Sequence, residues 1–178
     1  MLPDPALGKQ LELLAESFGY RQYRDAASAR KDDQVVRKCA AELLAEAADH
    51  LSRKAEEFAR LRIPPSTREQ PFPPAGLLAL HHDLVALKDA YSGVAAWIRA
   101  LPFPDRPRMP RGDSQYDGTL LQFDGKLLSL ARTAQAAVQD VEVAAWTGER
   151  QGPLRDALQK VEAVAKERQA YLSERGLP

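Results

Sequence analysis

Residues 113–128, DSQYDGTLLQFDGKLL, decide the fold class, because this stretch can be assigned as a loop, a β-hairpin or a helix. A helix explains most of its residues. Ser114 followed by Asp117 matches the capping-box pattern of a helix N-terminus. Apolar residues then recur at helical spacing for about eight turns. They are Tyr116, Leu120, Phe123, Leu127, Ala131, Ala134, Val138, Val141 and Ala145. We therefore predict a helix over residues 114–146.

Two alternatives exist for the same stretch. Residues 113–124 resemble the calcium-binding loop of EF-hand proteins, with Asp113, Asp117 and Asp124 as oxygen ligands and Gly118 at the sharp bend. The preceding proline-rich segment cannot supply the entering helix of that motif. The Asp124-Gly125 pair is a turn signal for a β-hairpin, but an isolated two-stranded ribbon is marginally stable. The helix is the favoured prediction.

Proline and glycine divide the rest of the chain into further helices. We predict helices at 5–18, 33–62, 77–101 and 153–175, with proline-rich connections at 63–76 and 102–113. Residues 20–32 are polar and are assigned as a loop or a short helix. No strand is predicted. The expected fold is all-α: one domain over residues 1–178, an antiparallel four-helix bundle with an additional short N-terminal helix.

Composition limits the classes of function. The 25 basic and 25 acidic residues cancel, so no global charge attracts nucleic acid or an anionic membrane. No apolar run approaches the length needed to span a bilayer, and the N-terminus has no signal-peptide pattern. The single Cys39 excludes an internal disulfide. These features predict a soluble, cytoplasmic protein without a membrane partner.

The residue pattern offers no catalytic or metal site. The three histidines, His50, His81 and His82, lack the helical spacing to other ligands that a metal centre requires. No nucleophile elbow, phosphate-binding loop or dinucleotide fingerprint is present. Cys39 is interpreted as a structural thiol. We predict no catalytic residue, no cofactor and no metal, and therefore no enzyme.

The leading functional prediction is a non-catalytic protein–protein interaction or assembly module that binds a protein partner or forms a homo-oligomer. Its candidate contacts are a strip of small residues opposite the apolar stripe of helix 114–146 and the arginines of the preceding connection. These contacts are Gly118, Gly125, Ser129, Ala136, Arg106, Arg108 and Arg111.

A second prediction, less favoured, is binding of RNA or DNA through two arginine-rich segments, 20–38 and 99–111. Both segments also contain aspartates that offset part of their positive charge. A third prediction is a helical bundle that binds a small molecule or a metal.

Overall fold

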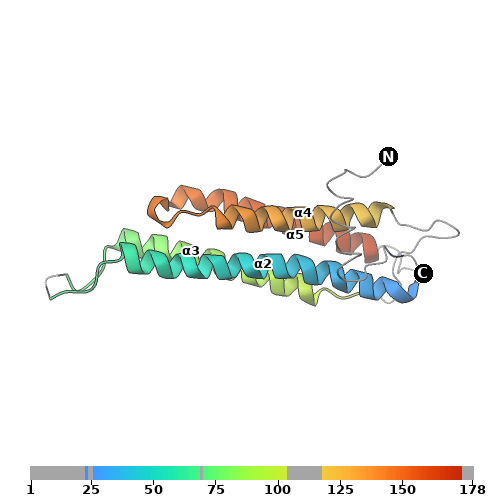
Figure 1. The fold of residues 1–178 in the computed structure, drawn as a ribbon, viewed down its shortest axis with the longest axis horizontal. Helices are drawn as coiled ribbons and strands as arrows, with labels where there is room; N and C mark the ends of the chain where they lie inside the picture. Colours follow the sequence, from blue (N-terminus) through green and yellow to red (C-terminus); the bar gives the residue numbers. More distant parts are fainter. Residues whose placement is uncertain (1–22, 24–25, 69, 104–117, 174–178) are drawn as a thin grey trace.

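The computed structural model describes residues 23, 26–68, 70–103 and 118–173, and all regular secondary structure in this part of the chain is helical, without a strand (Figure 1). Its long helices are α2 (Ala26–Arg62), α3 (Ala75–Ala100), α4 (Gly118–Gln139) and α5 (Gln151–Ser173). Two short 3₁₀ turns, η1 (Val143–Ala145) and η2 (Gly148–Arg150), join α4 to α5. The predicted all-α class is confirmed for these residues, whereas the predicted helix 5–18 lies outside them.

The helices pair as two hairpins that lie lengthwise against each other (Figure 1). Helix α2 packs along α3, and α4 packs along α5. Contacts between α2 and α4, and fewer between α3 and α5, join the hairpins. In Figure 1 the α2–α3 connection extends beyond the turn that joins α4 to α5. The α2–α3 connection therefore projects past the other hairpin, whereas the α4–α5 turn lies beside the α2–α3 hairpin.

The core follows the apolar stripes that the sequence predicts. Each helix buries residues spaced by three or four positions, as a helix with one face against its neighbours must. On α5, for example, these are Leu154, Leu158, Val161, Ala165 and Leu172. Alanines such as Ala40, Ala47 and Ala131 are fully buried, which lets the helix axes approach closely.

Helix α2 begins at Ala26, seven residues before the predicted start at residue 33. The polar character of residues 20–32 predicts a loop or a short helix and not an extension of this long helix. In the structure Ala29, Asp32 and Asp33 are buried instead, and the two aspartates are satisfied by buried partners. The extra helical turns are therefore held by tertiary contacts that a local pattern does not contain.

Helix α4 ends at Gln139, which corrects the predicted end at residue 146. The apolar residues beyond it are still buried, but through turns rather than through a continuing helix. Val141 and Val143 lie against the core, and the buried Trp146 donates its indole Nε1–H to the carbonyl of Leu80, 3.2 Å away. Because these residues are also apolar and buried, they continue the apolar spacing of α4. The sequence therefore predicts a helix that is longer than the one in the structure.

A helix that crosses a bilayer must be both long and predominantly apolar. Within the described ranges, none is both long enough and apolar enough to cross a membrane.

Candidate functional site

The predicted strip of small residues does not form one continuous surface. Gly118, Ser129 and Ala136 are exposed on α4, but Gly125 is buried. Helix α4 packs against both α2 and α5, so its buried arc is wider than one stripe and includes Gly125. The other predicted contacts, Arg106, Arg108 and Arg111, lie outside the described residues.

The alternative of a β-hairpin in residues 113–128 is wrong. The alternative of a calcium-binding loop is wrong for its second half, residues 118–124. Residues 118–124 are helical, so they do not form the loop that would surround a cation. Asp124 and Gly125 lie inside α4 and not at a turn. Asp124 is fully buried and forms an ion pair with Arg168.

Arg168 is the centre of a buried polar cluster that the sequence did not reveal. Its Nε donates to Oδ1 of Asp124 at 2.6 Å, and its Nη1 donates to Oδ1 of Asp33 at 2.7 Å. Its Nη2 donates to the hydroxyl oxygen of Tyr23 at 2.6 Å. These partners come from α4, from α2 and from the residue Tyr23 before α2. One side chain of α5 therefore connects both hairpins.

Asp33 extends the cluster to the end of α3. Its second oxygen, Oδ2, accepts from Nε of Arg37 at 2.8 Å and lies 2.5 Å from Nη2 of the same arginine. The remaining amino group of Arg37, Nη1, donates to the carbonyl of Arg99 at 3.2 Å and to the carbonyl of Leu101. Asp33 is thus shared between Arg37 and Arg168, and the four ion-paired side chains, which include Asp124, have no net charge.

Tyr23 is held at the other edge of the cluster in a backbone conformation that non-glycine residues rarely adopt, with φ of 56°. Its backbone N–H donates to Oδ2 of the buried Asp32 at 2.8 Å. Burial, reinforced by the nearby charge of Asp124, raises the pKa of the Tyr23 hydroxyl well above its usual value. The hydroxyl therefore stays protonated at neutral pH.

The cluster keeps the buried guanidinium of Arg168 in its charged form. Burial alone would lower the pKa of Arg168, but Asp124, Tyr23 and Asp33 raise it well above the usual value, so the guanidinium stays charged. Arg168 and Asp33 are both about 1% exposed. The signal in the sequence was a charged residue within an apolar stripe: Arg168 lies four residues from Val164 and from Leu172.

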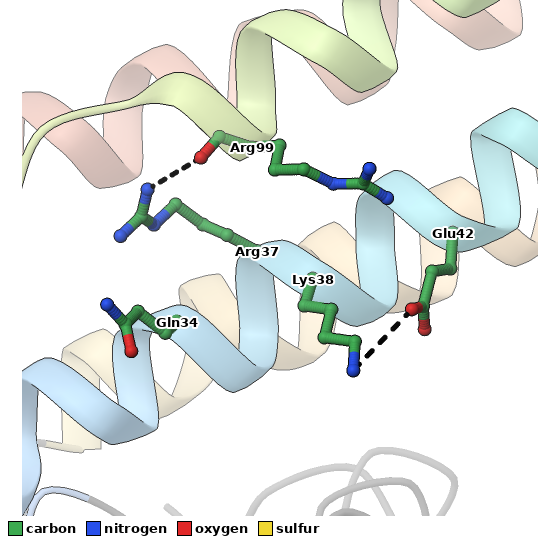
Figure 2. Close-up of a pocket in the computed structure, with 5 residues that line it drawn as sticks. All are labelled: Gln34, Arg37, Lys38, Glu42 and Arg99. Atoms are coloured by element: carbon green, nitrogen blue, oxygen red, sulfur yellow. Dashed lines mark hydrogen bonds and ion pairs between the residues drawn. The ribbon is translucent and has the colours of Figure 1, made fainter.

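The two predicted arginine-rich segments, as far as they are described, meet at one end of the molecule. The guanidinium of Arg30 on α2 lies 5.5 Å from the ring centre of Phe103, beyond the end of α3. Between these segments lies an open hollow of about 540 Å³, lined by Gln34, Arg37, Lys38, Glu42 and Arg99 (Figure 2). We call it the basic hollow. Sequence reasoning named both segments but could not show that they are adjacent.

The opposite end carries exposed apolar side chains. Leu61 is 62% exposed, Phe72 is 83% exposed and Leu78 is 44% exposed, and all three flank or belong to the α2–α3 connection. We call these three residues the hairpin tip. Phe103 also stands between two prolines but packs partly buried against the core, so exposure does not follow from the Pro-Phe-Pro sequence.

The connection that carries Phe72 is ordered by local hydrogen bonds. The N–H of Thr67 donates to the carbonyl of Gln70 at 3.0 Å, and the N–H of Gln70 donates to Oγ1 of Thr67 at 3.1 Å. The carbonyl of Pro74 accepts from Leu77 at 3.0 Å and from Leu78 at 3.2 Å, which fixes the start of α3. Phe72 lies between these two hydrogen-bonded segments.

No three histidine, cysteine, aspartate or glutamate side chains group together as metal ligands in the part of the chain that is described. Cys39 is half-buried, and burial, followed by the charge of Glu42, raises the pKa of its thiol. A raised pKa lowers the thiolate fraction, the reactive form, at neutral pH.

Comparisons with protein-family models, curated proteins and solved structures find no match for this chain.

Proposed function

We propose that this protein is a non-catalytic interaction module that binds another protein through the hairpin tip. The observation that carries the proposal is the exposure of Phe72, at 83%, beside the exposed Leu61 and Leu78. Moving apolar surface out of water is favourable by roughly 25 cal/mol per Å². A partner that covers Phe72 would gain this free energy.

The prolines around Phe72 support the same proposal. Pro71, Pro73 and Pro74 restrict the backbone on both sides of the ring. A segment that is restricted before binding loses less conformational entropy when it is bound. An exposed aromatic ring on a loop that prolines restrict is thus suited to insertion into a pocket of the partner.

The charge around the tip indicates the kind of partner. Between residues 58 and 80 the sequence holds Arg60, Arg62 and Arg68, with Glu69 as the one acidic residue. Two copies that met tip to tip would bring these arginines together, which is unfavourable. We therefore propose a different protein with an apolar pocket and an acidic rim, and we treat a homo-oligomer as the alternative outcome.

We further propose that the two hairpins form one antiparallel four-helix bundle, with residues 5–18 as an additional helix, and that the protein is cytoplasmic. The pairwise packing of α2 with α4 and of α3 with α5 supports the bundle. Gly118, Ser129 and Ala136 remain a secondary candidate surface for assembly.

Photo-crosslinking in the cells that make the protein tests this function. A photoreactive phenylalanine analogue at position 72 is expected to give one discrete crosslinked protein, whereas the same analogue at position 159, which is exposed on α5, is not. The binding of that protein to the purified chain is then measured by calorimetry. Phe72→Ala is expected to weaken binding about tenfold or more, while Gln70→Ala in the same loop leaves it unchanged.

The charge of the partner is tested by a separate pair of variants. Arg60→Glu and Arg68→Glu should weaken binding, and added salt should weaken it further. Equal crosslinking at positions 72 and 159, or an unchanged affinity of Phe72→Ala, would refute the tip as the binding surface. A crosslink between two copies of this chain would replace the hetero-partner with a homo-oligomer.

A further inference from the structure

The basic hollow contains two kinds of cationic side chain. One kind is already hydrogen-bonded within the protein, and the other is exposed and can bind a ligand. Arg37 directs Nε and Nη2 to Asp33 and Nη1 to two backbone carbonyls, so its donors already have acceptors. Lys38 and Arg99 have exposed side chains. The Nζ of Lys38 lies 3.8 Å from the carboxylate of Glu42, beyond the distance of a direct hydrogen bond. Among the described residues, no ion pair involves the guanidinium of Arg99.

The hollow therefore has an excess of positive charge. Asp33 offsets Arg37, and Glu42 offsets one of the two charges of Lys38 and Arg99. Arg30 and Lys31 are exposed one turn before Gln34 on the same side of α2 and add to this excess. Because α2 holds Lys38 while α3 holds Arg99, the packing of the two helices fixes the hollow between them.

We propose that the basic hollow binds a phosphate group between the side chains of Lys38 and Arg99. A free phosphate carries up to two negative charges near neutral pH and a backbone phosphodiester carries one, and both accept hydrogen bonds from several directions. Lysine supplies a compact charge, arginine supplies a planar fork of donors, and the exposed amide of Gln34 can donate as well. Figure 2 shows these side chains around the same opening. The hollow is independent of the hairpin tip.

The phosphate can belong to a free ion or to the backbone of a single-stranded nucleic acid, and two probes distinguish these sources. The first probe is inorganic pyrophosphate, and the second is a short single-stranded oligonucleotide. Calorimetry with the full chain at low salt measures both affinities. Binding of pyrophosphate alone identifies a small-ion site. Binding of the oligonucleotide with a steep decrease on adding salt identifies the nucleic acid backbone as the source.

The deciding variant is Lys38→Glu combined with Arg99→Glu. It should weaken the binding of either probe by about tenfold or more, because each charged hydrogen bond contributes roughly a tenfold factor. The matched control is Arg132→Glu with Lys160→Glu, which changes the net charge equally on the exposed faces of α4 and α5. This control should retain most of the affinity.

A second variant keeps the test valid if charge reversal disturbs folding. Lys38→Ala with Arg99→Ala removes the same donors without placing new carboxylates beside Glu42, and circular dichroism verifies that the variant is folded. Loss of binding in this folded alanine variant supports the site. Two results would overturn the proposal: no binding of either probe to the wild-type chain, or equal weakening by the hollow variant and by the Arg132/Lys160 control.

Discussion

The guanidinium of Arg168 on α5 lies 2.6 Å from the carboxylate of Asp124 on α4, and both side chains are removed from solvent. The same guanidinium lies 2.7 Å from Asp33 on α2. Because charges in the interior are costly unless they are paired, each partner depends on the others. The cluster therefore favours one alignment of the two hairpins over shifted alternatives, in which these charges would be buried without partners.

Replacing Arg168 with methionine should destabilise the protein by about 3–5 kcal/mol, because the buried Asp124 loses its ion pair and Asp33 keeps only its pair with Arg37. Urea denaturation followed by circular dichroism measures the change in the free energy of unfolding. Lys160→Met, on an exposed position of the same helix, should change it by less than about 0.5 kcal/mol. Similar small changes for both variants would show that the pairing of Arg168 contributes little to stability.

The sequence predicted the helices well and the buried charges poorly, for one physical reason. Apolar periodicity reports which face a helix buries, and it located the centres of α2, α3, α4 and α5. It does not report polar residues that are buried because a distant residue neutralises them. Asp33 and Arg168 are 135 positions apart, and only the packed structure brings them together.

The same limit applies to the candidate sites. The segments 20–38 and 99–111 were recognised as basic, but their contact depends on the length and pairing of α2 and α3. The exposure of Phe72 could not be predicted either, since Phe103 has the same proline neighbours and is partly buried. Gly125 was assigned to an outer face because a single stripe underestimates how much of α4 its two neighbouring helices cover.

Tyr91 should make the protein less stable in strongly alkaline solution. Its hydroxyl donates to the carbonyl of Leu154 at 3.0 Å, and burial raises its pKa from 10.0 to about 12. Between these two values the unfolded chain has lost a proton that the folded chain retains, so the free energy of unfolding falls as the pH rises. This contribution to stability is complete below pH 10 and is lost as the pH passes through about 12.

Denaturation by urea at a series of alkaline pH values measures this dependence, and tyrosinate absorbance measures the titration. Tyr91→Phe should have a shallower decrease of stability in the same interval, because the titrating group is absent. The variant loses the hydrogen bond to Leu154, which should cost roughly 1 kcal/mol at neutral pH. An identical alkaline decrease in both proteins would show that Tyr91 does not cause it.

Gly93→Ala should stabilise the protein by about 0.5–1 kcal/mol, because glycine inside a helix loses more backbone entropy on folding than alanine does. Gly93 is exposed within α3, and an added Cβ there would meet no atom within 4 Å. The midpoint temperature of unfolding should therefore rise. As a comparison, Ser92→Ala at the neighbouring exposed position should stabilise less. A decrease in stability would indicate that another part of the chain packs against Gly93.

Trp146 should hold the α4–α5 connection against α3. It is 1% exposed, and its indole N–H donates to the carbonyl of Leu80 at 3.2 Å. Trp146→Ala is expected to lower the free energy of unfolding by about 3–5 kcal/mol through the cavity it leaves. Trp146→Phe keeps most of the ring but loses the hydrogen bond, so it should cost roughly 1 kcal/mol beyond the smaller ring's lost packing.

Fluorescence distinguishes this role from a general loss of packing, because the chain has only two tryptophans. Trp97 is partly buried, so its emission should lie at longer wavelength than that of Trp146. Trp146→Phe should therefore remove the short-wavelength component, while Trp97→Phe should retain it and cost less stability. If Trp97→Phe removed the short-wavelength emission instead, Trp146 would be in contact with water and the connection would not be docked on α3.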